Sequence, residues 1–372
     1  MRFFVQNVSA CGVKRKRFFV YRWKLLGKPA QGKCEICTIT EETLYYINYD
    51  AIVKNAIFFK KRIGNSKLCA VVKNNAYGHG LLRTVGVLAD IADCFAVGSV
   101  EEALVVKQVA KNVLVLLPQD AEHAGKALSA DVALTVDSFR SLDVLQKAVP
   151  LGKKASVHLK IQTGMHRLGF DLCQLDELKK RLDLSKVRVD GVFSHFYGES
   201  TKDCDLQYAD FLQATKMLQS FLPQPFTRHI ANTSATLLGG YNADMVRVGL
   251  GLYGYGCDGL VPAKTVTAKV IALRNCKSGD KVSYGGYTLQ KDCTLAVVNC
   301  GYANGFPRAL KNAVVRINGQ NCPVVGKICM AMCMADVTGV EVDVGDSAVL
   351  LGKGVNNANC DVIIYELLCN LR

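Results

Sequence analysis

The chain has 372 residues, half of them apolar, so it can bury one large core or two moderate ones. This near-average composition excludes collagen, coiled coils and wholesale disorder, and no uncharged apolar run approaches the roughly 18 residues that a membrane span needs. With 46 Lys and Arg against 32 Asp and Glu, the formal net charge is +14.

The positive charge is concentrated in residues 1–40. This segment holds nine Lys and Arg and one acid, Glu35, and the other 332 residues carry 37 bases and 31 acids. A basic tail on a near-balanced body does not indicate nucleic-acid binding, and we expect neither a nucleic acid nor a membrane as partner. Because its apolar stretches are too short for a secretory signal, we interpret residues 1–40 as a basic N-terminal extension of unknown role.

Sixteen cysteines are scattered through apolar runs of the chain. Without a signal peptide, this usage is typical of reduced, buried thiols and favours a cytoplasmic location. Cys34 and Cys37 have the spacing of a metal or redox motif, but no second such pair accompanies them. The six histidines show no ligand spacing either, so we expect no metal site.

From about residue 45, short β-branched runs alternate with longer helical patterns. Eight of these runs are predicted strands, at 67–73, 93–100, 113–117, 131–136, 155–161, 187–195, 227–232 and 245–252. Most are separated by enough residues for a crossover helix, so we predict a (β/α)8 TIM-type barrel in residues 41–264. A doubly wound sheet is the alternative, but no GxGxxG follows the first strand.

After residue 264 the pattern changes to short alternating runs between segments rich in Gly, Asp and Asn. The runs lie at 269–273, 295–298, 313–317, 324–325 and 348–351. They predict a C-terminal all-β domain in residues 265–372, which ends in a helix at 360–368.

In a barrel, functional residues gather at the C-terminal ends of the strands. Lys73 closes the first predicted strand, where desolvation would lower its pKa and suit it to Schiff-base formation. Arg167 follows the fifth strand beside two glycines and has the geometry to clamp a carboxylate, and His195 ends the sixth strand, where it can contact a planar ring. Taken singly, each residue also has an ordinary structural explanation as a surface cation, a cap or a core histidine.

The last two strands end in groups suited to phosphate. Asn232, Thr233 and Ser234 precede a helix, and Gly249 and Leu250 offer backbone N–H groups nearby. Together with the lysine and arginine side chains, these groups are compatible with a phosphorylated, planar, aldehyde-bearing cofactor, a description that pyridoxal phosphate fits.

Ordered motifs along the chain resemble those of the alanine racemase family. Residues 71–80, VVKNNAYGHG, resemble its cofactor-lysine signature, and the likeness covers residues 45–370. The other motifs are Lys160 with 163–169, 194–196, 231–232, 247–249, 282–285, 301–305 and 326–330. The resemblance implies a homodimeric, pyridoxal phosphate-dependent isomerase that interconverts L- and D-alanine and supplies D-alanine for peptidoglycan in a bacterial cytoplasm.

The resemblance also implies a role for each matching residue. Lys73 would hold the cofactor as an internal aldimine and then act as one base, with Tyr284 of the partner subunit as the second base on the opposite face. Arg247 would bind the pyridine nitrogen, and Lys160 would be carbamylated. The implied cofactor contacts are Lys73, Tyr77, His195, Asn232, Thr233, Ser234, Arg247, Gly249 and Leu250, and the implied substrate contacts are Arg167 and Met330.

The chain departs from the family pattern at several positions. Ala331 stands where the family usually has an acid, and Gln162 and Asn304 each replace an Asp. Family members typically continue past the C-terminal helix and often supply another tyrosine to the phosphate, so a chain that ends at Arg372 is expected to lack that tyrosine. We therefore expect reduced cofactor affinity and rate.

Three alternatives remain open from the sequence. A serine-preferring or broad-specificity racemase would use the same framework, because a methyl and a hydroxymethyl group differ little. The departures also suit a weakly active or non-catalytic pyridoxal phosphate-binding homologue, although a single-domain carrier would lack the β domain and Tyr284. A fold-related decarboxylase is disfavoured by the contexts of Tyr284 and Arg247.

Overall fold

The structure is a computed structural model that describes residues 35–38, 43–355, 357 and 362–371, with the backbone alone for 35–38. Most of the predicted basic extension, including Cys34, therefore lies outside the described residues. Among the helices of the described part, none is both long enough and apolar enough to cross a membrane.

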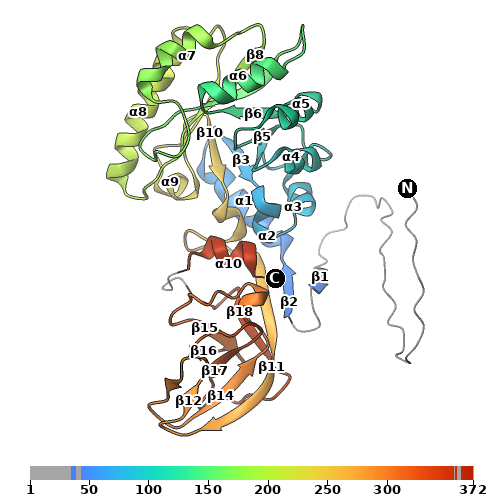
Figure 1. The fold of residues 1–372 in the computed structure, drawn as a ribbon, viewed down its shortest axis with the longest axis vertical. Helices are drawn as coiled ribbons and strands as arrows, with labels where there is room; N and C mark the ends of the chain where they lie inside the picture. Colours follow the sequence, from blue (N-terminus) through green and yellow to red (C-terminus); the bar gives the residue numbers. More distant parts are fainter. Residues whose placement is uncertain (1–34, 39–42, 356, 358–361, 372) are drawn as a thin grey trace, which may run out of the picture. The chain divides into compact units, whose positions relative to one another are not determined.

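A barrel of eight parallel strands forms the first sheet, as predicted (Figure 1). Its strands are β3 (Lys67–Val71), β4 (Cys94–Val97), β5 (Val113–Val115), β6 (Ala133–Val136), β7 (Ala155–Lys160), β8 (Val187–Phe193), β9 (Thr227–His229) and β10 (Met245–Val248). The strand order is β10-β3-β4-β5-β6-β7-β8-β9. The gap between β9 and β10 is bridged by backbone bonds from Asp244 N–H to Arg228 O and from Arg247 N–H to Ala231 O.

Helices and short helical turns lie before, between and after the barrel strands, and the longer ones are on the outside of the barrel (Figure 1). They are α1 (Tyr49–Arg62), α2 (Lys73–Gly78), α3 (Leu81–Leu88), α4 (Val100–Val106), α5 (Ala121–Ser129), α6 (Phe139–Ala148), η1 (Leu172–Gln174), α7 (Leu175–Arg181), α8 (Thr201–Gln219), α9 (Thr233–Leu238) and η2 (Leu250–Tyr253). Most begin at a residue whose side chain accepts a backbone N–H of the first turn, which offsets the unpaired donors of a helix start. These caps are Asn48, Ser99, Asp120, Ser138, Ser200 and Asn232.

The second large sheet is antiparallel. Its strands are β1 (Glu35–Thr38), β2 (Thr43–Ile47), β11 (Lys264–Cys276), β14 (Cys293–Val298), β15 (Val314–Ile317), β16 (Gln320–Val325), β17 (Cys333–Asp336) and β18 (Ser347–Leu351). Because β11 pairs with β14 and with β18, the strands from β11 to β18 close into a ring. The hairpin β12 (Lys281–Val282) and β13 (Tyr287–Thr288), η3 (Tyr302–Asn304) and the helix α10 (Ile364–Asn370) complete this part.

Several elements differ from the sequence prediction, and the short strands β1, β12 and β13 match none of the predicted runs. Strand β2 lies in the range assigned to the barrel but pairs with β11 of the second sheet, because a short alternating pattern does not specify its partner strand. Strand β17 was not predicted. The terminal helix begins at Ile364, four residues after the predicted start, and ends at Asn370.

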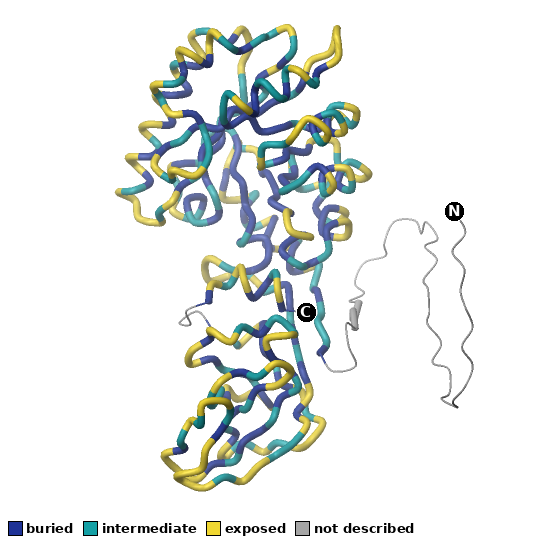
Figure 2. Tube along the Cα trace, in the orientation of Figure 1, coloured by how far each residue is buried: buried dark blue, intermediate teal, exposed yellow. Residues whose placement is uncertain are grey.

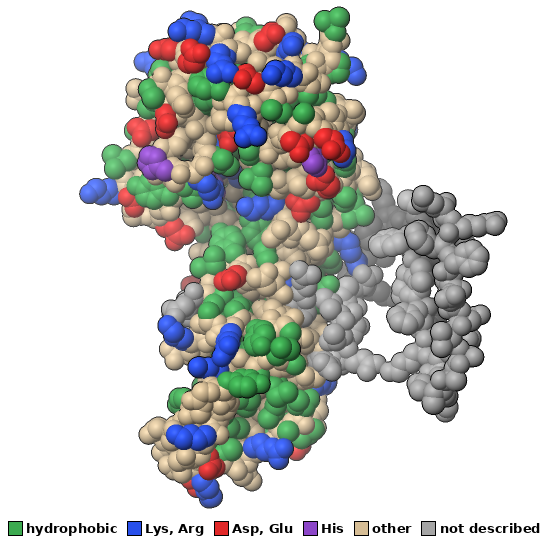
Figure 3. Space-filling view, viewed as in Figure 1, with side chains coloured by type: hydrophobic (Ala, Val, Ile, Leu, Met, Phe, Trp, Pro, Cys, Tyr) green, Lys and Arg blue, Asp and Glu red, His purple; other side chains and the backbone are tan. Residues whose placement is uncertain are grey.

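Burial follows the layering of the barrel, whose strands are buried while the outer helix faces are exposed (Figure 2). Helix α1 illustrates the pattern, since Ile52, Ala56 and Phe59 recur at intervals of three and four and are buried, while its last turn is basic. On the face shown in Figure 3, acidic and basic side chains of the barrel are interspersed.

An ion pair at the β9–β10 junction offers a test of barrel closure. The Asp244 carboxylate accepts bonds from Arg228 Nε and Nη2, both at 2.9 Å, and from the backbone N–H of Arg228 at 2.8 Å. The Arg228 guanidinium holds the pKa of Asp244 below its usual value. We expect Asp244→Asn to destabilise the chain by about 1 kcal/mol, the upper range for a partly exposed pair.

The pH dependence follows from the lowered pKa. The difference between wild type and Asp244→Asn is fully present above about pH 4 and shrinks as the pH falls through the folded-state pKa of Asp244. Urea unfolding at several pH values measures it. Glu122→Gln, which breaks the exposed pair of Glu122 with Lys126, is the matched control with little effect. An equal effect of both variants would contradict the structural role of Asp244.

Candidate active site

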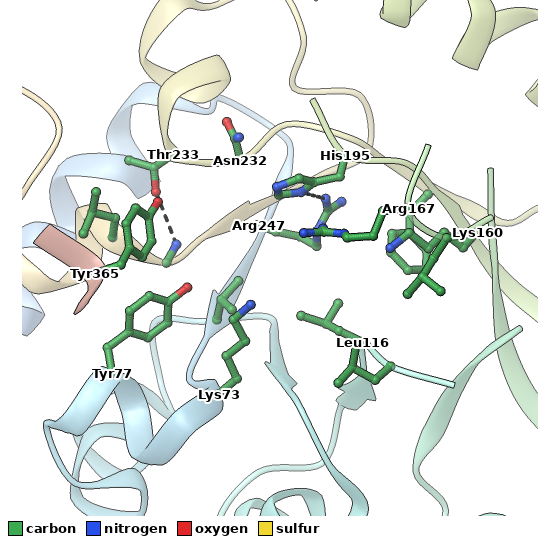
Figure 4. Close-up of a pocket in the computed structure, with 16 residues that line it drawn as sticks. Lys73, Tyr77, Leu116, Lys160, Arg167, His195, Asn232, Thr233, Arg247 and Tyr365 are labelled. Carbon is green, nitrogen blue, oxygen red and sulfur yellow. Dashed lines mark hydrogen bonds between the residues drawn. The ribbon is translucent and has the colours of Figure 1, made fainter. Parts of the chain in front are cut away.

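A cavity of about 340 Å³ opens at the C-terminal ends of the barrel strands (Figure 4). Its wall contains most of the site residues that the sequence predicts. The lining residues are Val71, Lys73, Tyr77, Leu116, Leu117, Lys160, Arg167, Leu168, Phe193, His195, Asn232, Thr233, Arg247, Gly249, Leu250 and Tyr365. Four side chains in this lining are cationic and none is a carboxylate, so the cavity suits an anionic ligand.

We expected Lys73 to end the first strand, but it lies after that strand, at the start of a turn. Strand β3 ends at Val71, and the four residues Asn74 to Tyr77 take up left-handed backbone angles with φ between 53° and 60°. L-residues avoid this conformation, and consecutive ones are rare. The turn changes the direction of the chain sharply, so that Lys73 and Tyr77 both reach the cavity.

Local hydrogen bonds hold the left-handed turn. Asn75 N–H donates to Glu102 Oε1 at 2.9 Å, and Asn75 Oδ1 accepts the Leu81 N–H at 2.8 Å. His79 Nδ1 lies 2.9 Å from the Ala76 carbonyl, which makes it the protonated ring nitrogen and a donor. The strained segment is thus fixed by neighbouring elements at both ends.

Arg247 is buried and lines the cavity at its cationic end, where several groups of the barrel bond to it. Its Nη1 lies 3.0 Å from His229 Nδ1, and its Nη2 lies 2.7 Å from Ser194 O and 3.1 Å from His195 Nδ1. Because a guanidinium only donates, both Nδ1 atoms accept. His229 therefore carries its proton on Nε2 and donates it to His158 Nδ1 at 2.8 Å.

These histidines are neutral because they are buried. Burial lowers the pKa of His158 to about 4, and burial followed by the nearby Arg247 lowers the pKa of His195 and that of His229 well below the usual value. Burial also lowers the pKa of Arg247 to about 10, which leaves it charged at neutral pH. The charged Arg247 guanidinium, with neutral histidines around it, is therefore available as a donor to a ligand in the cavity.

The two lysines of the cavity are easier to deprotonate than ordinary lysines. Burial, and next the charge of Arg167, lowers the pKa of Lys73. The same two causes lower the pKa of Lys160 to about 8. A deprotonated amine can attack a carbonyl or accept a proton, and a lowered pKa makes the Lys73 amine easier to deprotonate, as Schiff-base chemistry requires.

The opposite end of the cavity is lined by hydroxyl and N–H groups. Thr233 Oγ1 accepts the N–H groups of Gly249 at 3.3 Å and Gly251 at 3.2 Å. A Cβ on Gly249 would lie 2.7 Å from the Tyr77 hydroxyl, so only glycine allows this close approach. The groups converge on a small space that suits the phosphate of pyridoxal phosphate, and the cationic end suits its ring and substrate.

Tyr365 corrects the expectation that the phosphate end lacks a further tyrosine. It lies on α10 and lines the cavity, with its ring 5.8 Å from that of Tyr77 (Figure 4). Sequence reasoning missed it, although the predicted helix at 360–368 contains it, because the helical pattern does not show that this helix lies at the cavity. The available signal in the sequence was a tyrosine close to leucines in this helix, three residues before Leu368.

Three predicted residues lie outside the cavity lining. The Ser234 hydroxyl donates to Glu199 at 3.0 Å instead of facing the cavity. Tyr284 and Met330 belong to the antiparallel sheet and are 68% and 61% exposed. Their loops are tied together, since the Ser283 hydroxyl donates to the Lys327 carbonyl at 2.5 Å.

Two of the departures from the family pattern keep a structural role. Gln162 Oε1 accepts the N–H groups of Gly164 and His166, which shapes the loop that carries Arg167. Asn304 Oδ1 accepts the Gly301 N–H at 3.1 Å. An amide oxygen makes these bonds as a carboxylate would, whereas Ala331 offers no polar group in place of an acid.

Gly249→Ala tests the phosphate end of the cavity. The added Cβ displaces the Tyr77 hydroxyl, and we expect an affinity for pyridoxal phosphate lower by about tenfold, a typical cost of overpacking. Absorbance titration measures it. Gly125→Ala on α5, where a Cβ meets nothing within 4 Å, is the control. The loss should shrink in a Tyr77→Phe background, and an unchanged affinity would contradict the assignment.

Comparison with known proteins assigns the chain to a family. The profile described as "Alanine racemase, N-terminal domain" matches residues 47–256, and "Alanine racemase, C-terminal domain" matches residues 263–372. The alanine racemase of Shewanella loihica is 35% identical over 346 residues, covering 87% of this chain and 95% of that protein. That of Thermodesulfovibrio yellowstonii is 34% identical over 317 residues, covering 82% and 87%.

Solved structures agree with this assignment. The biosynthetic alanine racemase from Pseudomonas aeruginosa superposes with a TM-score of 0.82 at 29% identity, covering 90% of this chain and 98% of that one. The alanine racemase of Clostridium difficile 630 gives 0.79 at 30% identity, covering 90% and 94%. The chain therefore belongs to the alanine racemase family, whose members are pyridoxal phosphate-dependent isomerases acting on alanine.

Proposed function

We propose that this chain interconverts L- and D-alanine with Lys73 as one base and Tyr284 of the partner subunit as the other. The observation that supports it most is the position of Lys73, whose amine has a lowered pKa and lines a cationic cavity. When bound, pyridoxal phosphate draws electrons from the α-carbon of an amino acid and so acidifies its proton. The residues of the chain then have to move that proton.

Racemisation requires two bases on opposite faces of the α-carbon. The neutral Nζ of Lys73 removes the proton from one face, and the phenol of Tyr284 of the partner subunit returns a proton to the other. In the reverse direction the two residues exchange roles. Arg247 holds the pyridine nitrogen with a donor that keeps its own proton, which limits side reactions such as transamination.

The remaining contacts hold the ligands in place. In this proposal Tyr77, Thr233, Tyr365 and the N–H groups of Gly249 and Leu250 hold the phosphate. His195 and Asn232 contact the cofactor, whereas Ser234 supports the loop through Glu199. Arg167, together with the backbone of Met330 of the partner subunit, binds the substrate carboxylate.

The exposure of Tyr284 supports a homodimer with shared sites. The described lining of the Lys73 cavity contains no group from the hairpin β12–β13, and the tyrosine on that hairpin is largely exposed. A second copy related by two-fold symmetry would bring each Tyr284 to the other copy's cavity and form two equivalent sites. In this arrangement, residues 41–264 supply most of the cofactor contacts, and residues 265–372 supply Tyr365 and the second base.

Lys160 is proposed to be carbamylated. Its pKa of about 8 leaves part of the amine neutral at neutral pH. The neutral Nζ adds to carbon dioxide, forms an N–C bond and releases one proton, which gives an anion beside Arg167. That charge would orient the Arg167 guanidinium toward the substrate.

The biological role proposed is the supply of D-alanine for peptidoglycan in a bacterial cytoplasm. The twelve cysteines whose side chains the structure describes are free, and half of them are buried, which suits a reducing compartment. Incubation of the purified protein with pyridoxal phosphate and L-alanine or L-serine, followed by chiral chromatography, tests the function. D-alanine as the main product supports it, and predominant D-serine or no D-product contradicts it.

Lys73→Ala tests the cofactor lysine. Loss of the amine should abolish the visible absorbance of bound pyridoxal phosphate and lower racemisation by at least about 100-fold. Lys54→Ala removes an exposed lysine on α1 and should change neither property. Retained visible absorbance in the Lys73 variant would show that another group holds the cofactor.

Mixing two inactive variants tests whether the sites are shared. Lys73→Ala and Tyr284→Phe are each expected to be strongly impaired. If each site takes Lys73 from one copy and Tyr284 from the other, half of the dimers formed by refolding an equal mixture are hybrids with one intact site. Activity should recover to about a quarter of wild type. No recovery would mean that both bases belong to the same copy.

A further inference from the structure

A buried lysine lies outside the cavity, close to its phosphate end. Lys264 is the first residue of β11 and is 1% exposed. Burying an ammonium group is costly unless hydrogen bonds or π-faces replace its water. Lys264 Nζ donates to the Leu368 carbonyl at 2.8 Å and lies 5.5 Å from the centre of the Tyr45 ring.

The carbonyl that Lys264 binds belongs to the last turn of α10. This helix has seven residues and no side-chain hydrogen bond at its N-cap, so it has little stability of its own. The last carbonyls of a helix have no partner within it, and a cation placed there bonds to them and favours the helix dipole. Lys264 thus stabilises the end of α10 from outside the helix.

The residue that follows the left-handed turn, Gly78, also lies against the Leu368 carbonyl and Lys264. A Cβ on Gly78 would lie 2.6 Å from the Leu368 carbonyl oxygen and 3.2 Å from Lys264 Nζ, so the turn, the helix end and the ammonium are in close contact. The adjacent His79 does not compete as a second cation, because burial and then the charge of Lys264 lower its pKa to about 3.

Tyr365 and Tyr77 are carried by the two segments that meet here. Tyr365 lies on α10 and Tyr77 in the turn, with their rings 5.8 Å apart at the phosphate end of the cavity. We propose that Lys264 is a positioning residue for this pair, and that its bond to the Leu368 carbonyl fixes α10 so that Tyr365 stands where the cofactor phosphate binds. The inference rests on the proposed cofactor site and extends it to the first residue of β11.

Lys264→Met tests the proposal, because methionine keeps the length of the side chain but cannot donate. We expect the affinity of the dialysed full-length protein for pyridoxal phosphate to fall about tenfold. Affinity for pyridoxal, which lacks the phosphate, should not change. Lys264→Arg keeps a donor and should recover part of the loss. In a Tyr365→Phe background, Lys264→Met should cost nothing further.

Lys269→Met is the matched control, since Lys269 lies on the same strand and donates to a backbone carbonyl, Gly345 O, at 2.8 Å, but is exposed and does not contact α10. It should leave both affinities unchanged.

Equal losses for pyridoxal phosphate and pyridoxal, or an undiminished effect of Lys264→Met in the Tyr365→Phe background, would overturn the proposal. Racemase activity does not enter these measurements. A protein that binds pyridoxal phosphate but does not racemise alanine would therefore contradict the proposed function and leave this result standing.

Discussion

The left-handed turn from Asn74 to Tyr77 determines where the lysine and the tyrosine of the cavity lie. Four such residues cost about 1–2 kcal/mol each, and this cost is offset by contacts from other elements. Glu102 of α4 bonds to the backbone of the turn, and the end of α10 closes against Gly78. Because the strain is balanced by parts of the chain far apart in sequence, the turn forms only in the complete fold. The position of the reactive amine is therefore a property of the tertiary structure.

The cavity combines permanent charge with neutral acceptors. Arg247 is surrounded by backbone carbonyls and by two histidines. Because a guanidinium cannot accept a hydrogen bond, the Nδ1 atoms that face it carry no proton. This arrangement keeps a donor aimed at one end of the site without adding further buried charge. The positive charges of Arg167 and Arg247 also lower the pKa of their lysine neighbours, so the groups that bind an anionic ligand prepare the amines for chemistry.

Much of the fold could be predicted from local pattern. Eight apolar runs of strand length with crossover segments between them indicate a barrel, and the residues at their C-terminal ends lie around one cavity, as the topology requires. The left-handed turn could not be predicted, because asparagine tolerates these angles only as single residues and Ala76 and Tyr77 normally avoid them. The sheet partner of β2 depends on a strand more than 200 residues away. Tyr365 was missed because only the fold brings a seven-residue terminal helix to the cavity. Tyr284 is matched by motif, but a single chain does not contain the surface that would complete its site.

The pairing of β2 with β11 has a consequence for how the chain is made. Strand β2 leaves the ribosome before the barrel, and its partner in the second sheet follows only after the whole barrel has been synthesised. At typical rates of 5–20 residues per second, the strand waits on the order of 10 to 40 seconds for its partner. During that time the edge of β2 that pairs with β11, in a segment with two tyrosines, Leu44 and Ile47, has no partner, and an unpaired edge is a template for aggregation. The nascent chain should therefore be most vulnerable to aggregation late in translation, when the barrel can already fold but the second sheet is incomplete.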